Sequence, residues 1–142
     1  ESGPGRSARL GEGMKREPEW LLEKTVLAAH AEQIAEHGGS GGIRDKGLLE
    51  SALAHPQNLY HYGAPTLFDL AAAYATRIAK NHPFIDGNKR TAYVAARTFL
   101  LLNSGDLVAT KEEKVKIMLD LAAGPLSENK LSQWMESPSE KP

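Results

Sequence analysis

Residues 82–90 place a base, a carboxylate, an amide and two cations within nine positions, reading His-Pro-Phe-Ile-Asp-Gly-Asn-Lys-Arg. His82 is the only candidate base in this segment. An imidazole with an ordinary pKa of about 6.5 can remove the proton of a hydroxyl group near neutral pH. Phosphoryl or nucleotidyl transfer requires mainly positioning, charge stabilisation and an acceptor for that proton. The segment carries residue types suited to all three tasks.

The place of this segment, directly before an apolar run, indicates an anion-binding site. The run from Ala92 to Leu102 predicts a buried helix that ends at Asn-Ser-Gly. The N-terminus of a helix presents unpaired N–H groups and about half a positive charge. Lys89 and Arg90 add two full charges. Gly87 permits close approach of a ligand to the backbone, and the Asn88 amide can orient that ligand. We therefore expect a cradle for phosphate groups.

Asp86 is the candidate metal ligand, because Mg²⁺ is usually held by one or two carboxylates together with substrate phosphates and waters. A calcium loop starting at Asp86 is excluded, since Arg97 occupies the twelfth position, where a bidentate glutamate is required. A Walker A loop at residues 42–47 is also excluded, because Leu48 and Leu49 stand where lysine and a hydroxyl residue are required. One plain structural alternative stays open, in which the polar residues of the segment only cap a helix and form a solvated basic face.

The nine residues closely resemble the signature of the Fic/Doc family, in the form found in Doc, the "death on curing" toxins. The resemblance continues upstream through residues 41–58 and extends from about Trp20 to Met135. It implies a compact all-α bundle of about six helices, with a central motif loop followed by a buried helix. It also implies ATP and Mg²⁺ as cofactors.

Two residues depart from the usual Fic pattern. Lys89 replaces the glycine that ends the nucleotide loop, and Tyr93 stands where Fic proteins carry a second arginine. The lysine fills space that the α-phosphate needs for AMP transfer, and losing the arginine removes a contact to the outer phosphates. Doc-like members share both departures and are understood to bind ATP in the reverse orientation and to transfer its γ-phosphate, with elongation factor Tu as a known class of target.

We therefore expect a toxin that phosphorylates a protein hydroxyl and blocks translation. The alternatives are AMP transfer (adenylylation) and a catalytically silent interaction module. The expected catalytic residues are His82, Asp86, Lys89 and Arg90, the expected nucleotide-binding or phosphate-binding residues are Gly87, Asn88, Lys89 and Arg90, and Asp86 is the expected Mg²⁺ ligand.

The resemblance to Doc-like toxins also implies a partner, a small antitoxin whose disordered tail folds onto the toxin. We therefore expect a groove of exposed apolar helix faces that binds this tail. Some Fic proteins instead carry an inhibitory helix of their own. The segment from Ser132 to Ser137 matches that pattern only in part, and the arginine that it would engage is missing at Tyr93. Control within the chain is therefore not expected.

Composition bounds the remaining possibilities. The chain has 142 residues, of which 41% are hydrophobic and 25% charged, with a formal net charge of −1, so it fits one domain with a substantial core. The small net charge argues against binding to nucleic acid or anionic membranes. No cysteine is present, which excludes disulfides and thiolate metal sites. Without a membrane-spanning run or a signal-peptide core, we expect a cytoplasmic protein.

The first thirteen residues lack periodicity and precede Met14. We expect a flexible tail at residues 1–17, one domain at 18–137 and a second tail at 138–142. The residues of the first tail are either natural or derived from expression.

Helical periodicity dominates the domain, and we expect no strand apart from a short extended piece near Leu107 and Val108. The expected helices run from about Glu23 to His37, from the cap Asp45 to just before Pro56, from a capping box at Thr66 and Asp69 to about Asn81, through the run after residue 90, from a second box at Thr110 and Glu113, and from Ser127.

The remaining histidines carry weaker signals. His30 and His37 lie seven apart, but two histidines without a third ligand are more often ordinary surface or core residues. His55 and His61 flank a polar, aromatic stretch that we read as a loop, so residues 57–64 are a candidate for a flap that docks the substrate. A plain surface loop is the alternative.

Overall fold

The computed structural model describes residues 17–136, and these form an all-α domain without a regular strand, as the sequence predicts. The helices are α2 (Glu23–His37), α3 (Lys46–Tyr62), α4 (Leu67–Asn81), α5 (Asn88–Leu102), α6 (Lys111–Ala123) and α7 (Glu128–Glu136). Of the expected tails at 1–17 and 138–142, all but Glu17 lies outside the described residues. Within residues 17–136, no helix is long and apolar enough to cross a membrane.

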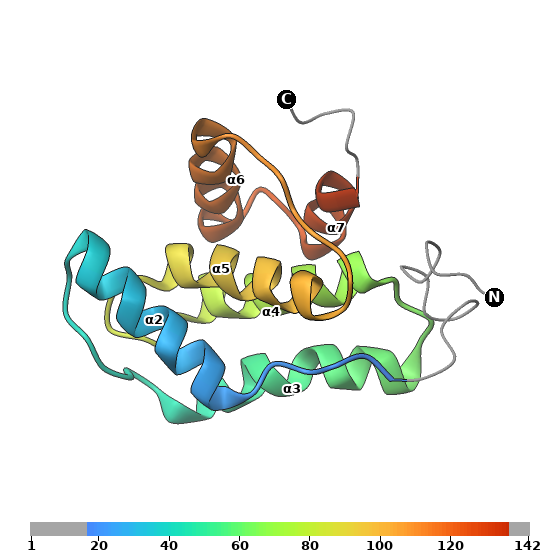
Figure 1. The fold of residues 1–142 in the computed structure, drawn as a ribbon, viewed down its shortest axis with the longest axis horizontal. Coiled ribbons are helices and arrows are strands. Elements are labelled where there is room, and N and C mark those ends of the chain that lie inside the picture. Colours follow the sequence, from blue (N-terminus) through green and yellow to red (C-terminus); the bar gives the residue numbers. More distant parts are fainter. Residues whose placement is uncertain (1–16, 137–142) are drawn as a thin grey trace.

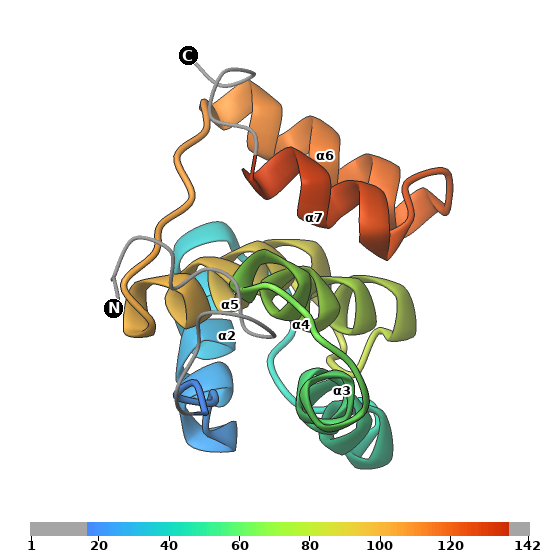
Figure 2. The same ribbon diagram turned by 90° about the vertical axis from the view of Figure 1, so that its right-hand side faces the viewer.

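The helices lie in three layers, with α4 and α5 side by side in the middle (Figures 1 and 2). α6 and α7 cover one side of this pair, and α2 and α3 cover the other. α4 is buried along almost its whole length, because it packs against α3, α5 and α7. Its alanines, and those of α5, allow the two backbones to approach closely in the core.

Both predicted capping boxes are present. Thr66 Oγ1 accepts from the Asp69 N–H, and Asp69 Oδ2 accepts from the Thr66 N–H. Thr110 and Glu113 form the same pair of bonds at the start of α6. Asp69 has a second function, since its Oδ1 accepts a 2.6 Å hydrogen bond from Ser132 Oγ on α7. The capping-box residue Asp69 therefore also joins α7 to α4.

The predicted end of α3 is wrong. The residue before a proline is biased away from helical geometry, and this bias placed the end before Pro56. In the structure Pro56 is buried inside α3, which continues to Tyr62. Tertiary packing compensates for the missing backbone N–H. Residues 57–62 are consequently helical, and the flap predicted at 57–64 does not exist as a loop.

The extended piece near Leu107 and Val108 is not a strand. The Leu107 side chain is buried, and its N–H donates to Asp106 Oδ1, which fixes the turn between α5 and α6.

A buried hydrogen bond joins the segment before α2 to α4, since the Leu21 N–H donates to the hydroxyl oxygen of Tyr74. Burial raises the pKa of Tyr74 to about 12.

We expect Asp69→Ala to lower the free energy of unfolding by about 2 kcal/mol, because the Thr66 N–H and the Ser132 hydroxyl both lose their acceptor. Urea denaturation followed by circular dichroism measures this change. Asp120→Ala is the control, since it removes only an exposed ion pair with Lys116, worth about 0.5 kcal/mol. Equal losses in the two variants would contradict the linking role of Asp69.

Candidate functional site

The predicted site residues meet in the loop between α4 and α5 and at the start of α5. His82 is the C-cap of α4 and has a left-handed backbone, with φ 52° and ψ 60°, which is uncommon for a residue other than glycine. Its side chain is exposed. The His82 imidazole, the candidate base, is therefore presented directly at the end of the most buried helix of the domain.

Arg44 holds His82 in this conformation. Its Nε donates to the His82 carbonyl at 2.6 Å, and Nη2 donates to the Asn81 carbonyl at 2.7 Å. These bonds satisfy carbonyl groups at the C-terminus of α4, which have no partner within the helix. The N–H groups of Arg44 and Asp45 also donate to the Pro83 carbonyl, at 2.7 and 3.0 Å. The chain just before α3 thus fixes the backbone that carries the candidate base.

The same segment continues alongside the motif loop. The Ile85 N–H donates to the Gly42 carbonyl at 3.1 Å, and Ile43 forms an isolated antiparallel bridge with Phe84. Residues 42–45, rather than the predicted 57–64, are therefore the segment that borders the site.

Asn88 closes the motif loop on itself. The Phe84 N–H donates to Asn88 Oδ1, and Asn88 Nδ2 donates to the Phe84 carbonyl, each at 3.0 Å. The Asn88 side chain is buried, so both bonds lie away from bulk water. The sequence suggested that this amide orients a ligand, whereas in the structure it binds the backbone of the loop.

Gly87 precedes α5 and leaves the N-terminus of this helix without a side-chain cap. It is the N-cap, has φ 80° and ψ 15°, and supplies no side-chain hydrogen bond. The first helical bond runs from the Thr91 N–H to the Gly87 carbonyl, at 3.0 Å. The backbone amides of residues 88–90 therefore precede the first helical bond and lack an intrahelical acceptor. A side chain at position 87 would also bring its Cβ to 3.2 Å from Ile34 Cδ1.

Lys89 and Arg90 flank these amides, and both are exposed. Neither forms an ion pair with any residue in the described part of the chain. Two full positive charges thus stand beside the partial charge of the helix terminus, as expected for an anion site.

Asp86 is exposed but fixed at both its polar ends. The Ser40 N–H donates to Asp86 Oδ2 at 2.8 Å, and His30 Nε2 lies 2.7 Å from the Asp86 carbonyl oxygen. No group of three or more histidine, cysteine, aspartate or glutamate side chains within residues 17–136 is arranged to hold a metal ion. Any metal at this site would therefore rely on Asp86 together with ligand oxygens and water, which suits Mg²⁺.

Tyr93 stands at the position of the second arginine of Fic proteins, and its side chain packs within the domain. It is buried on α5, and the Lys114 ammonium lies 5.2 Å from the centre of its ring. Burial raises the pKa of the Tyr93 phenol; the Arg97 charge opposes this, and Asp106 and Glu113 add to it. Its hydroxyl has no hydrogen-bond partner among the described residues.

The remaining histidines are separated. His30 is buried and His37 exposed on the same helix, so they do not form a pair. His55 lies within α3 and pairs with Glu128 on α7 at 3.1 Å. Ser132, part of the inhibitory near match, is committed to Asp69.

Sequence reasoning missed three residues that hold the site: His30, Ser40 and Arg44. Arg44 lies in a stretch that resembles the family, but no local pattern pairs it with residues 81 and 82.

The chain is similar in sequence to known proteins. The profile of the Fic/DOC family matches residues 20–100. Toxin Doc of Mycolicibacterium smegmatis is 47% identical over 93 residues, which cover 64% of this chain and 69% of that protein. Protein kinase doc of Escherichia phage P1 is 32% identical over 108 residues, which cover 75% of this chain and 85% of that protein.

We expect Asn88→Ala to lower the free energy of unfolding by about 2–4 kcal/mol, because a buried N–H and a buried carbonyl of Phe84 both lose their partner. Asn88→Asp keeps the acceptor for the N–H and should cost less. Chemical denaturation measures both changes. Asn58→Ala, at an exposed position of α3, is the control and should change stability by less than about 0.5 kcal/mol. A loss no larger than the control's would exclude the closing role of Asn88.

Proposed function

The chain belongs to the Fic/Doc family, and from this premise we propose that it transfers the γ-phosphate of ATP to a hydroxyl side chain of a target protein. The observation that carries the proposal is the open N-terminus of α5. Its amides lack a side-chain cap, Lys89 and Arg90 lie beside them, and His82 stands exposed at the other end of the short loop. An anion site and a base are thus held on one rigid support.

These positions support the following roles. The backbone amides of residues 88–90, with Lys89 and Arg90, bind the phosphates and stabilise the charge that spreads over the transferred group. Asp86 would hold Mg²⁺, which would supply charge to neutralise the phosphates. His82 takes the proton of the target hydroxyl. A new P–O bond forms to that oxygen, the bond between the γ-phosphorus and its bridging oxygen breaks, and ADP leaves.

Two residues favour phosphate transfer over AMP transfer. Lys89 is exposed at the second position of α5, where its side chain reduces the space for an α-phosphate close to the amides. Tyr93 is buried beneath Lys114 and offers no cation to the outer phosphates. Adenylylation remains the alternative reaction, and a silent interaction module is the alternative function. The phage P1 relative is named a protein kinase, which supports phosphate transfer.

We further propose that the chain is a toxin acting in the cytoplasm, and that its target is elongation factor Tu, so that phosphorylation blocks translation. The name of the mycobacterial relative, a toxin, supports this class of function.

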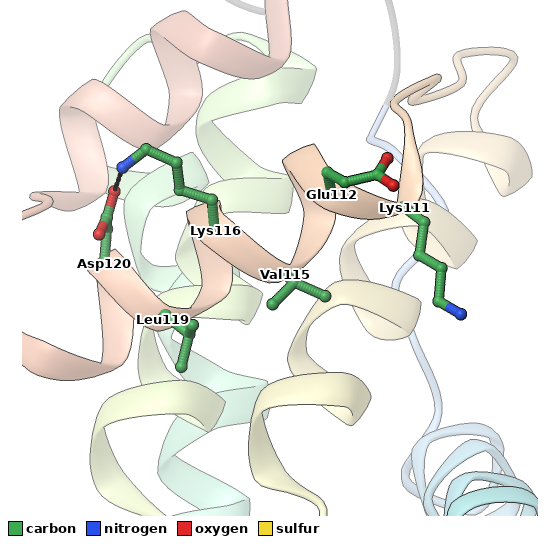
Figure 3. A pocket seen from close by; sticks show the side chains of 6 residues that line it. All are labelled: Lys111, Glu112, Val115, Lys116, Leu119 and Asp120. Carbon is green, nitrogen blue, oxygen red and sulfur yellow. Dashed lines mark hydrogen bonds and ion pairs between the residues drawn. The ribbon is translucent and has the colours of Figure 1, made fainter.

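A small antitoxin with a disordered tail is the partner that we propose. The supporting surface is a shallow hollow on α6, where Val115 and Leu119 are 54% and 49% exposed (Figure 3). Their side chains lie on one side of α6, next to the ion pair of Lys116 and Asp120. An amphipathic segment that folds on binding can cover such a strip.

We expect the tail of a cognate antitoxin to raise the melting temperature of the chain, since a ligand at about 100 times its Kd stabilises by about 2.7 kcal/mol. Leu119→Lys should abolish the shift, whereas Val108→Lys, at an exposed apolar residue outside the hollow, should retain it. An unchanged shift in Leu119→Lys would place the partner elsewhere.

We expect His82→Asn to reduce transfer from ATP by at least about 100-fold, because the base is lost. Asparagine tolerates the left-handed backbone at this position, so the fold should persist. Labelled phosphate incorporated into elongation factor Tu or a bacterial lysate measures transfer. His61→Asn, at an exposed position of α3, is the matched control and should remain active. Full activity in His82→Asn would refute the assignment of the base.

We expect Asp86→Asn to raise the Mg²⁺ concentration needed for half-maximal transfer by about tenfold or more, since a charged ligand is replaced by a neutral one. The amide oxygen can still accept from the Ser40 N–H, so the loop should keep its shape. Asp120→Asn on α6 serves as the control. A Mg²⁺ titration identical to that of the wild type would remove Asp86 from the metal site.

A further inference from the structure

His30 on α2 contacts the motif loop at two residues, Phe84 and Asp86. It is 4% exposed, its ring stacks on Phe84 with centroids 3.9 Å apart and planes within 8°, and its Nε2 lies 2.7 Å from the Asp86 carbonyl oxygen. Its Nε2 and Cδ2 also lie 3.6 Å from where a Cβ on Gly87 would be. Because a carbonyl oxygen can only accept, His30 Nε2 carries the hydrogen and donates it.

This hydrogen bond fixes more than one atom. The Asp86 carbonyl and the Gly87 N–H belong to the same planar peptide unit, which is trans here, so the two groups point in opposite directions. The carbonyl points at the buried His30 ring, and the Gly87 N–H therefore points away from it. The Gly87 N–H donates to no backbone carbonyl in the described part of the chain.

We infer that His30 is a positioning residue for phosphate binding: by holding the Asp86 carbonyl, it turns the Gly87 N–H toward the anion site and adds it to the amides of residues 88–90. This inference rests on the proposed function. The same bond steadies the Asp86 carboxylate, whose Oδ2 is held on its other side by the Ser40 N–H at 2.8 Å. His30 touches neither nucleotide nor target in this arrangement and acts only through the loop.

Packing alone is the competing explanation, because the stacked ring also joins α2 to the core. Two substitutions of similar length separate the explanations. His30→Gln provides an amide N–H that can reach the Asp86 carbonyl, whereas His30→Met fills similar space without a donor. Both lose the aromatic stack equally. His37→Met, at an exposed position of the same helix, is the control.

The experiment measures the Kd for ATP with Mg²⁺ by calorimetry and the Gly87 amide resonance by ¹H–¹⁵N NMR, with melting temperatures recorded for every variant. We expect His30→Met to bind at least about tenfold more weakly than wild type, the lower end of the loss caused by removing a group that orients a metal ligand. His30→Gln should stay within a few fold of wild type. The Gly87 resonance should move in the Met variant and return toward its wild-type position in the Gln variant.

Equal affinities in the Gln and Met variants, whether both normal or both weak, would overturn the role of His30. Wild-type protein that binds no ATP with Mg²⁺ would instead overturn the proposed function itself, and the inference with it. If His30→Met does not fold, the Gly87 resonance and ATP affinity of His30→Gln decide: both should match the wild type, and displacement of both would contradict the inference.

Discussion

The two hydrogen bonds between Asn88 and the backbone of Phe84 are the constraint on which the site depends. They are buried, so breaking them would leave an N–H and a carbonyl without partners away from water. The loop they close leads into Gly87, whose left-handed backbone starts α5 without a side-chain cap. A helix terminus that stays open is costly unless water or a ligand satisfies it. Because Asn88 fixes the loop, the N-terminus of α5 stays uncapped, and its free amides are suited to binding an anion.

Contacts from several parts of the domain keep this loop in place. α4 and α5 form the buried central pair, and the loop joins their ends (Figure 1). Arg44 fixes the last turn of α4, and His30 reaches the loop from α2. Because a displacement of about 1 Å at a reactive group can cost roughly a hundredfold in rate, such supports matter as much as the groups that touch the substrate.

Local signals predicted much of this architecture, and long-range contacts account for what they missed. The capping boxes at Thr66 and Thr110 bind within three residues of themselves, so their sequence spacing is sufficient. The continuation of α3 through Pro56 could not be predicted from local sequence, because packing in the core decides whether a helix can accommodate a proline. His30 and Arg44 lie 56 and 38 positions from their partners, and their roles depend on how α2 and α3 pack. The motif residues were found because they are contiguous.

The central claim is that this fold positions ATP to lose its γ-phosphate to a protein hydroxyl. The most direct test incubates the purified chain and Mg²⁺ with elongation factor Tu, and separately with a bacterial lysate, using ATP labelled on either the α-phosphate or the γ-phosphate. We expect protein labelled from the γ-phosphate only. Label from the α-phosphate would show AMP transfer despite Lys89, and no label in either mixture would contradict the proposed enzymatic function.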